Sequence, residues 1–169
     1  MRVAIIMGST SDLSKVESAV DILKSYGVKV DVRCLSAHRA HEALSQFIDE
    51  ANHNGTEVII AAAGMAAALP GVVASQTVLP VIGVPIAGSQ LDGMDALFSI
   101  VQMPPGIPVA TVAINGAKNA AILATSILGT GNEELKNKLI DYKASMKSAV
   151  LEKNSKLQNL GYEDYLKQM

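Results

Sequence analysis

Two short polar stretches hold the side chains best suited to chemistry in this sequence. Residues 8–12 read Gly-Ser-Thr-Ser-Asp and residues 36–39 read Ser-Ala-His-Arg; each follows an apolar, strand-like run and precedes a helical pattern. In an open parallel α/β sheet, ligands bind beyond the carboxyl ends of the strands, where helix N-termini present free backbone N–H groups. We therefore expect the two stretches, spaced as in adjacent strand–helix units, to converge on one anionic small molecule.

The first stretch supplies hydroxyls and a carboxylate. Gly8 permits a close approach of the backbone to a ligand, and the hydroxyls of Ser9, Thr10 and Ser11 add donors where the helix dipole favours an anion. Asp12 suits hydrogen bonds from ribose hydroxyls. The alternative interpretation is that Ser11 or Asp12 only caps the following helix. The stretch lacks the glycine and lysine spacing of the common phosphate-binding loops.

The second stretch supplies an imidazole and a guanidinium. His38 is a candidate general acid and base, because an imidazole can both donate and accept a proton, while Arg39 beside it suits a phosphate. The alternative is that His38, like many single histidines, is a structural or surface residue. His41 and His53 lie on the predicted helix over residues 40–53 and are expected to face solvent or to be packing residues. The histidines and Cys34 lack the spacing of a zinc site, so no metal is expected.

A third stretch, residues 62–71, consists of small and apolar residues without a titratable group. It can offer a flat ligand only backbone N–H groups and close packing. The alternative is that its residues are small because helices and strands crowd there. Further along the chain, Asp92 and Asp95 are expected to cap a short helix, and Lys118 to be solvated.

Alternating strands and helices must position these stretches. Continuous apolar runs predict strands buried on both faces, as in a parallel sheet, and segments with apolar residues at helical spacing separate them. We expect one α/β domain over residues 1–169. The predicted strands are 3–7, 28–35, 57–62, 81–85 and 108–114, and the predicted helices are 13–26, 40–53, 70–77, 91–101, 117–128 and 132–160.

Two of these helices indicate self-association. Residues 117–128 are apolar nearly all round, which is typical of a helix buried on every side, and a chain of 169 residues has few layers to bury it. The sequence from residue 132 onward is lysine-rich and amphipathic, so a long terminal helix is expected to cross the surface or a neighbouring subunit. We therefore treat residues 131–169 as a helical extension that packs on neighbouring subunits.

Composition excludes several classes of partner. A net charge of −2 and a pI near 5.9 leave no basic field for nucleic acid or an anionic membrane surface, so a phosphate would need a local site. No apolar segment approaches the roughly 20 residues that span a bilayer. Cys34 is the single cysteine, which excludes an internal disulfide and fits a reducing compartment. A cytoplasmic location is therefore expected.

Three motifs resemble those of a known family. Met7-Gly-Ser-Thr-Ser-Asp12, Ser36-Ala-His-Arg39 and Ser99-Ile-Val-Gln-Met-Pro104 are similar to motifs of the N5-carboxyaminoimidazole ribonucleotide mutases of purine biosynthesis. These enzymes are also called the catalytic subunit of phosphoribosylaminoimidazole carboxylase. The third motif continues as Gly106-Ile-Pro108, again as in the family. The resemblance covers nearly the whole chain up to the terminal helix.

The resemblance implies a fold, an activity and a site. The implied fold is a three-layer, flavodoxin-like, doubly wound parallel sheet with a long C-terminal helix, in a homo-octamer without metal or organic cofactor. The implied activity moves a carboxylate from the exocyclic nitrogen of the ribonucleotide to ring carbon C4, with His38 as general acid and base. Ser9, Ser11, Asp12 and Arg39 are implied to bind the ribonucleotide. The substrate-binding residues expected in all are Gly8, Ser9, Ser11, Asp12, Ser36, Ala37, Arg39, Ala63, Gly64 and Leu69.

Departures from the family pattern leave a second activity open. The mutases usually read Gly-Gly-Ala-Ala-His-Leu-Pro-Gly where residues 64–71 read Gly-Met-Ala-Ala-Ala-Leu-Pro-Gly. A related class II lyase carboxylates aminoimidazole ribonucleotide directly with carbon dioxide, and typically has Ala at the position of Ala68 but Lys at that of Arg39. Arg39, Pro70 and the segment around Gln102 favour the mutase. A non-catalytic nucleotide-binding module on the same fold is the third interpretation.

Overall fold

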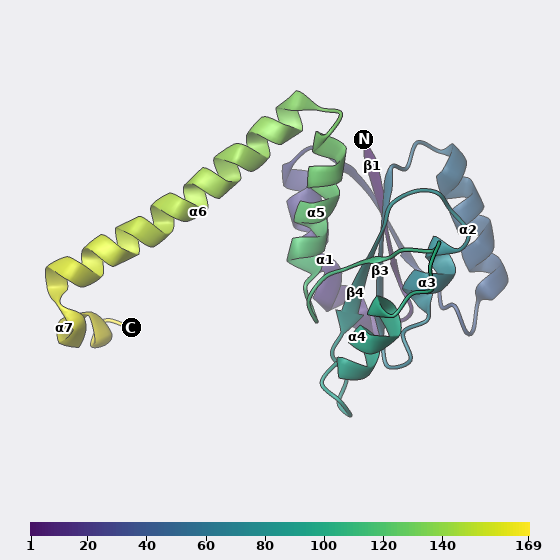
Figure 1. Ribbon diagram of the computed structural model, residues 1–169, viewed down its shortest axis with the longest axis horizontal. Helices are drawn as coiled ribbons and strands as arrows, with labels where there is room; N and C mark the ends of the chain where they lie inside the picture. The colour runs from purple at the N-terminus through teal and green to yellow at the C-terminus, as the bar shows by residue number, and fades with distance from the viewer.

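The structure, a computed structural model that describes residues 1–169, is organised around a five-stranded parallel sheet (Figure 1). The strand order is β2-β1-β3-β4-β5, and all four strand pairs are parallel. This is the order of flavodoxin-like doubly wound sheets, so the predicted fold class is confirmed. The strands are β1 (Arg2–Met7), β2 (Lys29–Cys34), β3 (Val58–Gly64), β4 (Val81–Ile86) and β5 (Ala110–Thr111).

Helices cover both faces of the sheet and divide the core into two clusters. One cluster of 19 buried residues joins the sheet to α1 (Leu13–Ser25) and α5 (Ala117–Gly129). The other, of 16 buried residues, joins it to α2 (His41–His53), α3 (Leu69–Ala74) and α4 (Met94–Val101) (Figure 1). Because neighbouring residues of a strand point to opposite faces, a strand covered on both sides is apolar throughout.

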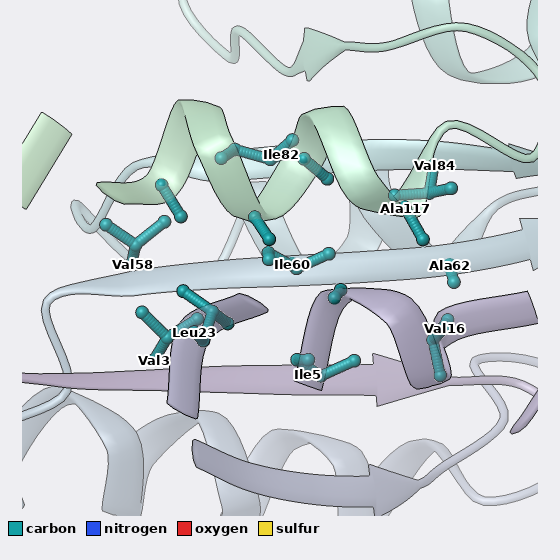
Figure 2. Close-up of a cluster of buried hydrophobic side chains, with 14 of the residues drawn as sticks. Val3, Ile5, Val16, Leu23, Val58, Ile60, Ala62, Ile82, Val84 and Ala117 are labelled. Atoms are coloured by element: carbon teal, nitrogen blue, oxygen red, sulfur yellow. The ribbon is translucent and has the colours of Figure 1, made fainter. Parts of the chain in front are cut away.

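Figure 2 shows how aliphatic side chains fill the first cluster. Val3 of β1 and Val58 of β3 lie on the face of the sheet that meets Val16 and Leu23 of α1 and Ala117 of α5. All five are 0% exposed. Full burial of a Val or Leu side chain stabilises a fold by about 1.5–3 kcal/mol, so this packing holds β1 and β3 firmly in place. The loops that leave their carboxyl ends therefore start from a rigid frame.

The predicted elements are confirmed to within a few residues, except at the far edge of the sheet. There β5 contains only Ala110 and Thr111, whereas the apolar run predicts a strand over 108–114. The backbone N–H of Val112 still donates to the carbonyl of Gly83 (3.1 Å), and the regular pairing of β5 with β4 ends there. The outer edge of β4 is thus left without a strand beyond this point.

The start of α4 also differs from the prediction. Asp92 and Gly93 adopt positive φ angles of 50° and 89°, which interrupt the helix and delay its first residue to Met94. Gly93 occupies the N-cap position, and no side chain caps the helix. The prediction that Asp92 and Asp95 cap this helix is therefore wrong.

Burial of α5 needs no second subunit for most of its surface. The helix packs against α1, β3 and β4 and against the start of α6 (Glu133–Leu160). Lys118, Asn119 and Ser126 remain exposed and form a narrow polar face. The apolar residues of α5 are thus mostly covered within the chain, and this helix alone does not require the self-association that its sequence pattern indicates.

The C-terminal arm, α6 and α7 (Tyr162–Leu166), extends away from the α/β body (Figure 1). The side chain of Asn132 caps α6 by accepting a hydrogen bond from the N–H of Leu135 (2.9 Å). Leu135 and Leu139 are the buried residues of this 28-residue helix. The terminal helix was expected to cross either the surface of its own chain or a neighbouring subunit. The first of these alternatives is wrong, because the arm points away from the body. No helix in the protein has the length and apolar character needed to traverse a bilayer.

Candidate active site

A cavity of about 640 Å³ opens at the carboxyl ends of β1 to β4. It lies where the chain order reverses between β1 and β3, which is where ligands bind in doubly wound sheets. Its volume is that of a small-molecule site. Four segments line it: residues 8–12, 36–39, 63–69 and 86–88. Within the first segment, Thr10 is not part of the lining. The lining contains the expected catalytic residue and all the expected substrate-binding residues, namely Gly8, Ser9, Ser11, Asp12, Ser36, Ala37, His38, Arg39, Ala63, Gly64 and Leu69, but not Thr10, whose hydroxyl was a further candidate donor.

The loop after β1 is organised by the Ser9 hydroxyl. Ser9 Oγ accepts a hydrogen bond from the backbone N–H of Ser11 (3.3 Å) and so caps the 3-10 turn of Thr10–Asp12. The Ser11 hydroxyl lies 2.8 Å from Ser9 Oγ and 3.4 Å from Asp12 Oδ1, so its one proton can serve either acceptor. Asp12 occupies the N-cap position of α1, but its carboxylate makes no capping bond. The capping alternative for Ser11 and Asp12 is therefore wrong, and Thr10 faces solvent outside the cavity.

Asp12 is the acidic group of the cavity. Partial burial of its carboxyl raises its pKa above the ordinary value of 3.8, because the charged form loses hydration. Hydrogen bonds from the Ser11 side chain and at the Ser9 backbone oppose this shift. A bound ligand that donates hydrogen bonds to Asp12 would restore part of the solvation that the charged carboxylate has lost.

Arg39 joins the loop after β2 to the loop after β1. Its Nη2 donates to the carbonyl oxygen of Gly8 (3.2 Å), and its Nε donates to Ser36 Oγ (3.4 Å). The predicted convergence of the two polar loops is thus present in the fold. Both His38 and Arg39 are exposed, so they border the open side of the cavity and can be reached by a ligand.

The loops after β3 and β4 form an apolar wall. Gly64 lies so close to β4 that a Cβ there would sit 3.2 Å from the carbonyl oxygen of Ile86. The N–H groups of Ala67 and Ala68 are engaged within their own loop, with the carbonyls of Met65 (2.9 Å) and Ala66 (2.7 Å). These two N–H groups are therefore not free for a ligand, and the wall contributes mainly shape and exclusion of water.

Sequence reasoning placed some residues correctly outside the site and missed others inside it. His41 and His53 are exposed on α2, and Lys118 is exposed on α5; none of them lines the cavity. No cluster of three His, Cys, Asp or Glu side chains is arranged to hold a metal ion. Met65, Ala66, Ala67 and Ala68 also line the cavity; they belong to the stretch 62–71, for which a ligand role was left open, but were not among the expected binding residues. The lining residues that the sequence analysis missed altogether are Ile86, Ala87 and Gly88. For Ala87 and Gly88 a signal was available, because this pair of small residues directly follows the apolar run of β4.

Comparison with known proteins decides the family. The family model for AIR carboxylase matches residues 2–149, which is most of the chain. The chain belongs to the AIR carboxylase family. The cavity and its four loops lie entirely within the matched residues, whereas the outer part of the C-terminal arm lies beyond them. The resemblance that the three motifs indicate is thereby confirmed.

Curated relatives in the AIR carboxylase family align over nearly the whole chain. N5-carboxyaminoimidazole ribonucleotide mutase of Thermotoga maritima is 54% identical over 99% of this chain and 98% of its own. The mutase of Saccharolobus solfataricus is 55% identical over 89% of this chain and 95% of its own. The chloroplastic phosphoribosylaminoimidazole carboxylase of Vigna aconitifolia is 51% identical over 96% of this chain, which corresponds to 29% of that longer protein.

A solved structure of the family has the same fold. The crystal structure of Treponema denticola PurE superposes with a TM-score of 0.86 at 31% sequence identity. The match covers 92% of this chain and 98% of that one. The flavodoxin-like sheet and its flanking helices are therefore shared with an experimentally determined member of the family.

Proposed function

We propose that this protein is an N5-carboxyaminoimidazole ribonucleotide mutase, an isomerase of purine biosynthesis. The observation that carries the proposal is the convergence of His38, Arg39 and the Ser9–Asp12 network on one cavity, in a chain that is 54% identical to a curated mutase over almost its full length. The reaction moves a carboxylate from the exocyclic nitrogen of the ribonucleotide to ring carbon C4. No cofactor is needed for this transfer.

The polar loops hold the ribose phosphate. Arg39 uses two of the five N–H donors of a guanidinium on Gly8 and Ser36, which leaves three for a phosphate. The hydroxyls of Ser9 and Ser11 add neutral donors beside it. Asp12 accepts hydrogen bonds from the ribose hydroxyls. The aminoimidazole ring then lies toward the apolar wall.

His38 moves the protons of the reaction. It donates a proton to the exocyclic nitrogen as the carbamate C–N bond breaks and carbon dioxide leaves. Carbon C4 then attacks carbon dioxide, and His38 takes back a proton from C4 as aromaticity returns, so that the histidine ends in its starting state. An imidazole suits both steps because it can act as a proton donor and as a proton acceptor.

The apolar wall confines the released carbon dioxide. Ala66, Ala67 and Ala68 line the cavity without any group that would compete as a nucleophile. Recapture by C4 is therefore effectively intramolecular, which favours it strongly over escape into solvent.

A labelling experiment separates this function from the two alternatives. Substrate that carries an isotopic label in its carbamate carbon is converted in unlabelled bicarbonate buffer. We expect the label mainly in the C4 carboxylate of the product. Loss of label to solution, together with a faster reaction of aminoimidazole ribonucleotide and bicarbonate than of the carboxylated substrate, would identify the chain as a direct carboxylase, the activity that Ala68 favours. Binding without any conversion would identify a nucleotide-binding module.

The proposed enzyme acts as a cytoplasmic homo-octamer in which residues 131–169 pack on neighbouring subunits. Two exposed apolar surfaces support the assembly. On and just before α4, Leu91, Met94, Phe98 and Val101 are each at least 43% exposed at helical spacing. Along the arm, Met146 and Val150 continue the apolar stripe of Leu135 and Leu139 into solvent. Large exposed patches of this kind mark sites of association.

Light scattering after size exclusion measures the assembly directly. An octamer of this 17.7 kDa chain has a mass of roughly 140 kDa. We expect this mass for the wild type and a smaller assembly for Val150→Asp, with an unchanged content of helix. A wild-type monomer at micromolar concentration would contradict the proposed assembly but not the proposed reaction.

A further inference from the structure

The wall of the cavity after β4, residues 86–88, lies beyond the point where the pairing of β4 with β5 ends. The β4–β5 ladder contains the pairs Ile82–Ala110 and Gly83–Thr111, and Val112 N–H donates to the Gly83 carbonyl. In a parallel ladder the next bond would come from the N–H of residue 85. That residue is Pro85, which has no N–H, so the ladder is interrupted exactly where the strand approaches the cavity.

Asn115 resumes these contacts two residues further along β4. Its backbone N–H donates to the carbonyl of Pro85 (2.8 Å), and its side-chain Oδ1 accepts from the N–H of Ala87 (3.1 Å). The side-chain carbonyl takes the place that a strand carbonyl would have in a continued ladder. One residue thereby holds the backbone on both sides of Ile86, and Ile86, Ala87 and Gly88 line the cavity.

The backbone at Asn115 suits an asparagine in particular. Its φ is +55°, in the left-handed region that Asn tolerates better than most non-glycine residues. The adjacent turn is tight, since Gly116 N–H donates to the Ala113 carbonyl (2.8 Å) and a Cβ at Gly116 would lie 2.6 Å from that oxygen. Gly93 lies close to both this turn and the wall, because a Cβ there would meet Ile114 (2.7 Å) and Ala87 (3.0 Å).

We propose that Asn115 is a positioning residue of the candidate active site, which fixes the residue 86–88 wall through Pro85 and Ala87 without touching the substrate itself. Asn115 is exposed and belongs to neither core cluster, so its side chain is not needed to fill the interior. When the side-chain amide oxygen of Asn115 is removed, the Ala87 N–H loses its hydrogen-bond acceptor. The binding of the ligand must then order the wall. The kinetic consequence rests on the proposed mutase function, whereas the effect on the wall itself does not.

Three variants test the role of the side-chain oxygen. Asn115→Gly keeps the positive φ but removes the acceptor, and Asn115→Asp keeps an acceptor oxygen at a residue type that also tolerates this φ. Asp92→Gly is the matched control, because Asp92 has a similar φ of +50° in the neighbouring loop and does not line the cavity.

Hydrogen exchange followed by mass spectrometry reports on the wall without any substrate. For Asn115→Gly we expect faster exchange in peptides that cover residues 84–90 and unchanged exchange in β1 and β3. Asn115→Asp and Asp92→Gly should exchange there as the wild type does. Unchanged exchange in Asn115→Gly would overturn the proposal, even if the wild type proved to have no mutase activity.

Steady-state kinetics with N5-carboxyaminoimidazole ribonucleotide tests the consequence for the site. Loss of one hydrogen bond that orders the wall should raise KM about threefold to tenfold in Asn115→Gly, with kcat within about twofold of wild type. Asn115→Asp should restore most of the lost affinity. Equal KM values in wild type and Asn115→Gly, or a similar loss in Asp92→Gly, would show that Asn115 does not position the site. A wild type without turnover would refute the proposed function instead.

Discussion

The two halves of the cavity are built from different kinds of residue. The loops after β1 and β2 carry every hydroxyl, carboxylate, imidazole and guanidinium of the lining, and Arg39 ties them together through Gly8. The loops after β3 and β4 carry no titratable group, and their spacing is set by backbone contacts such as that between Gly64 and Ile86. The boundary between the halves coincides with the reversal of chain order between β1 and β3.

This division suits a substrate that is itself divided. A ribose phosphate needs charged and hydroxyl partners, whereas a flat ring that exchanges carbon dioxide needs a dry and closely fitting surface. In the proposed function, the polar half binds the ribose phosphate and moves the protons, and the apolar half shapes the space for the ring and the carbon dioxide. Substitutions in the two halves should accordingly change different measured quantities.

The largest effect is expected from His38 in the polar half. His38→Asn should lower kcat by a factor on the order of 10² or more, the usual contribution of a general acid and base. Folding should be preserved, because His38 is exposed and belongs to neither core cluster. His41→Asn, three residues away on α2 and outside the cavity, is the matched control and should turn over as the wild type does. Turnover near the wild-type rate in His38→Asn would remove this residue from the mechanism.

Loss of Arg39 should mainly weaken binding. A hydrogen bond to a charged group contributes about 1.5–3 kcal/mol, so Arg39→Ala should raise KM about 10-fold to 100-fold. The increase should be smaller for a substrate analogue without its 5′-phosphate. Arg33→Ala serves as control, since Arg33 stacks on Phe47 and pairs with Asp31 outside the cavity. An equal loss for both substrates would mean that Arg39 does not bind the phosphate.

Two glycine substitutions compare the space that each half of the cavity leaves for an added side-chain carbon. At Gly64 a Cβ would press on the Ile86 carbonyl at 3.2 Å, so Gly64→Ala should cost about 1 kcal/mol of unfolding free energy. At Gly8 nothing lies within 4 Å of an added Cβ, so Gly8→Ala should stabilise by up to about 1 kcal/mol by restricting the unfolded chain. Chemical denaturation measures both. Effects of the same sign would contradict the difference in packing between the halves.

The smallest effect concerns the pH dependence of stability at Asp12. Burial raises the pKa of this carboxyl in the folded state above 3.8, so the folded protein binds the proton more tightly than the unfolded chain. Stability contributed by this group is therefore lost as the pH rises above that value through the folded pKa. The difference in unfolding free energy between Asp12→Asn and the wild type should therefore be more favourable to the variant at about pH 7 than at about pH 3. Denaturation midpoints at both pH values check this, and a pH-independent difference would contradict it.

Much of the polar half could be predicted because its signals are local. Residues 8–12 and 36–39 are contiguous, and each follows an apolar run whose end marks the carboxyl end of a strand. Parallel pairing then brings the strand ends to one edge of the sheet, whatever the details of packing. The apolar half gave a weaker signal, since alanine and glycine are as typical of crowded packing as of a binding surface.

The predictions that failed concern features that depend on contacts between segments far apart in the sequence. The run 108–114 has the composition of a strand, but Pro85 on β4 offers no N–H to pair with it, and the regular pairing ends after Val112. Likewise, the apolar circumference of α5 says how much surface must be covered but not by what, and α1, the sheet and α6 cover most of it.

The sequence by itself determined the order of strands and helices, the polar residues at the strand ends and the family, because each depends on residues close together in the chain. Only the tertiary structure decided that Arg39 reaches Gly8, that Asn115 holds the wall at Ala87 and that α6 leaves the body after Leu139. These contacts join residues tens of positions apart or depend on which surfaces remain uncovered. Their geometry follows from how whole layers pack, which no local pattern of residues encodes.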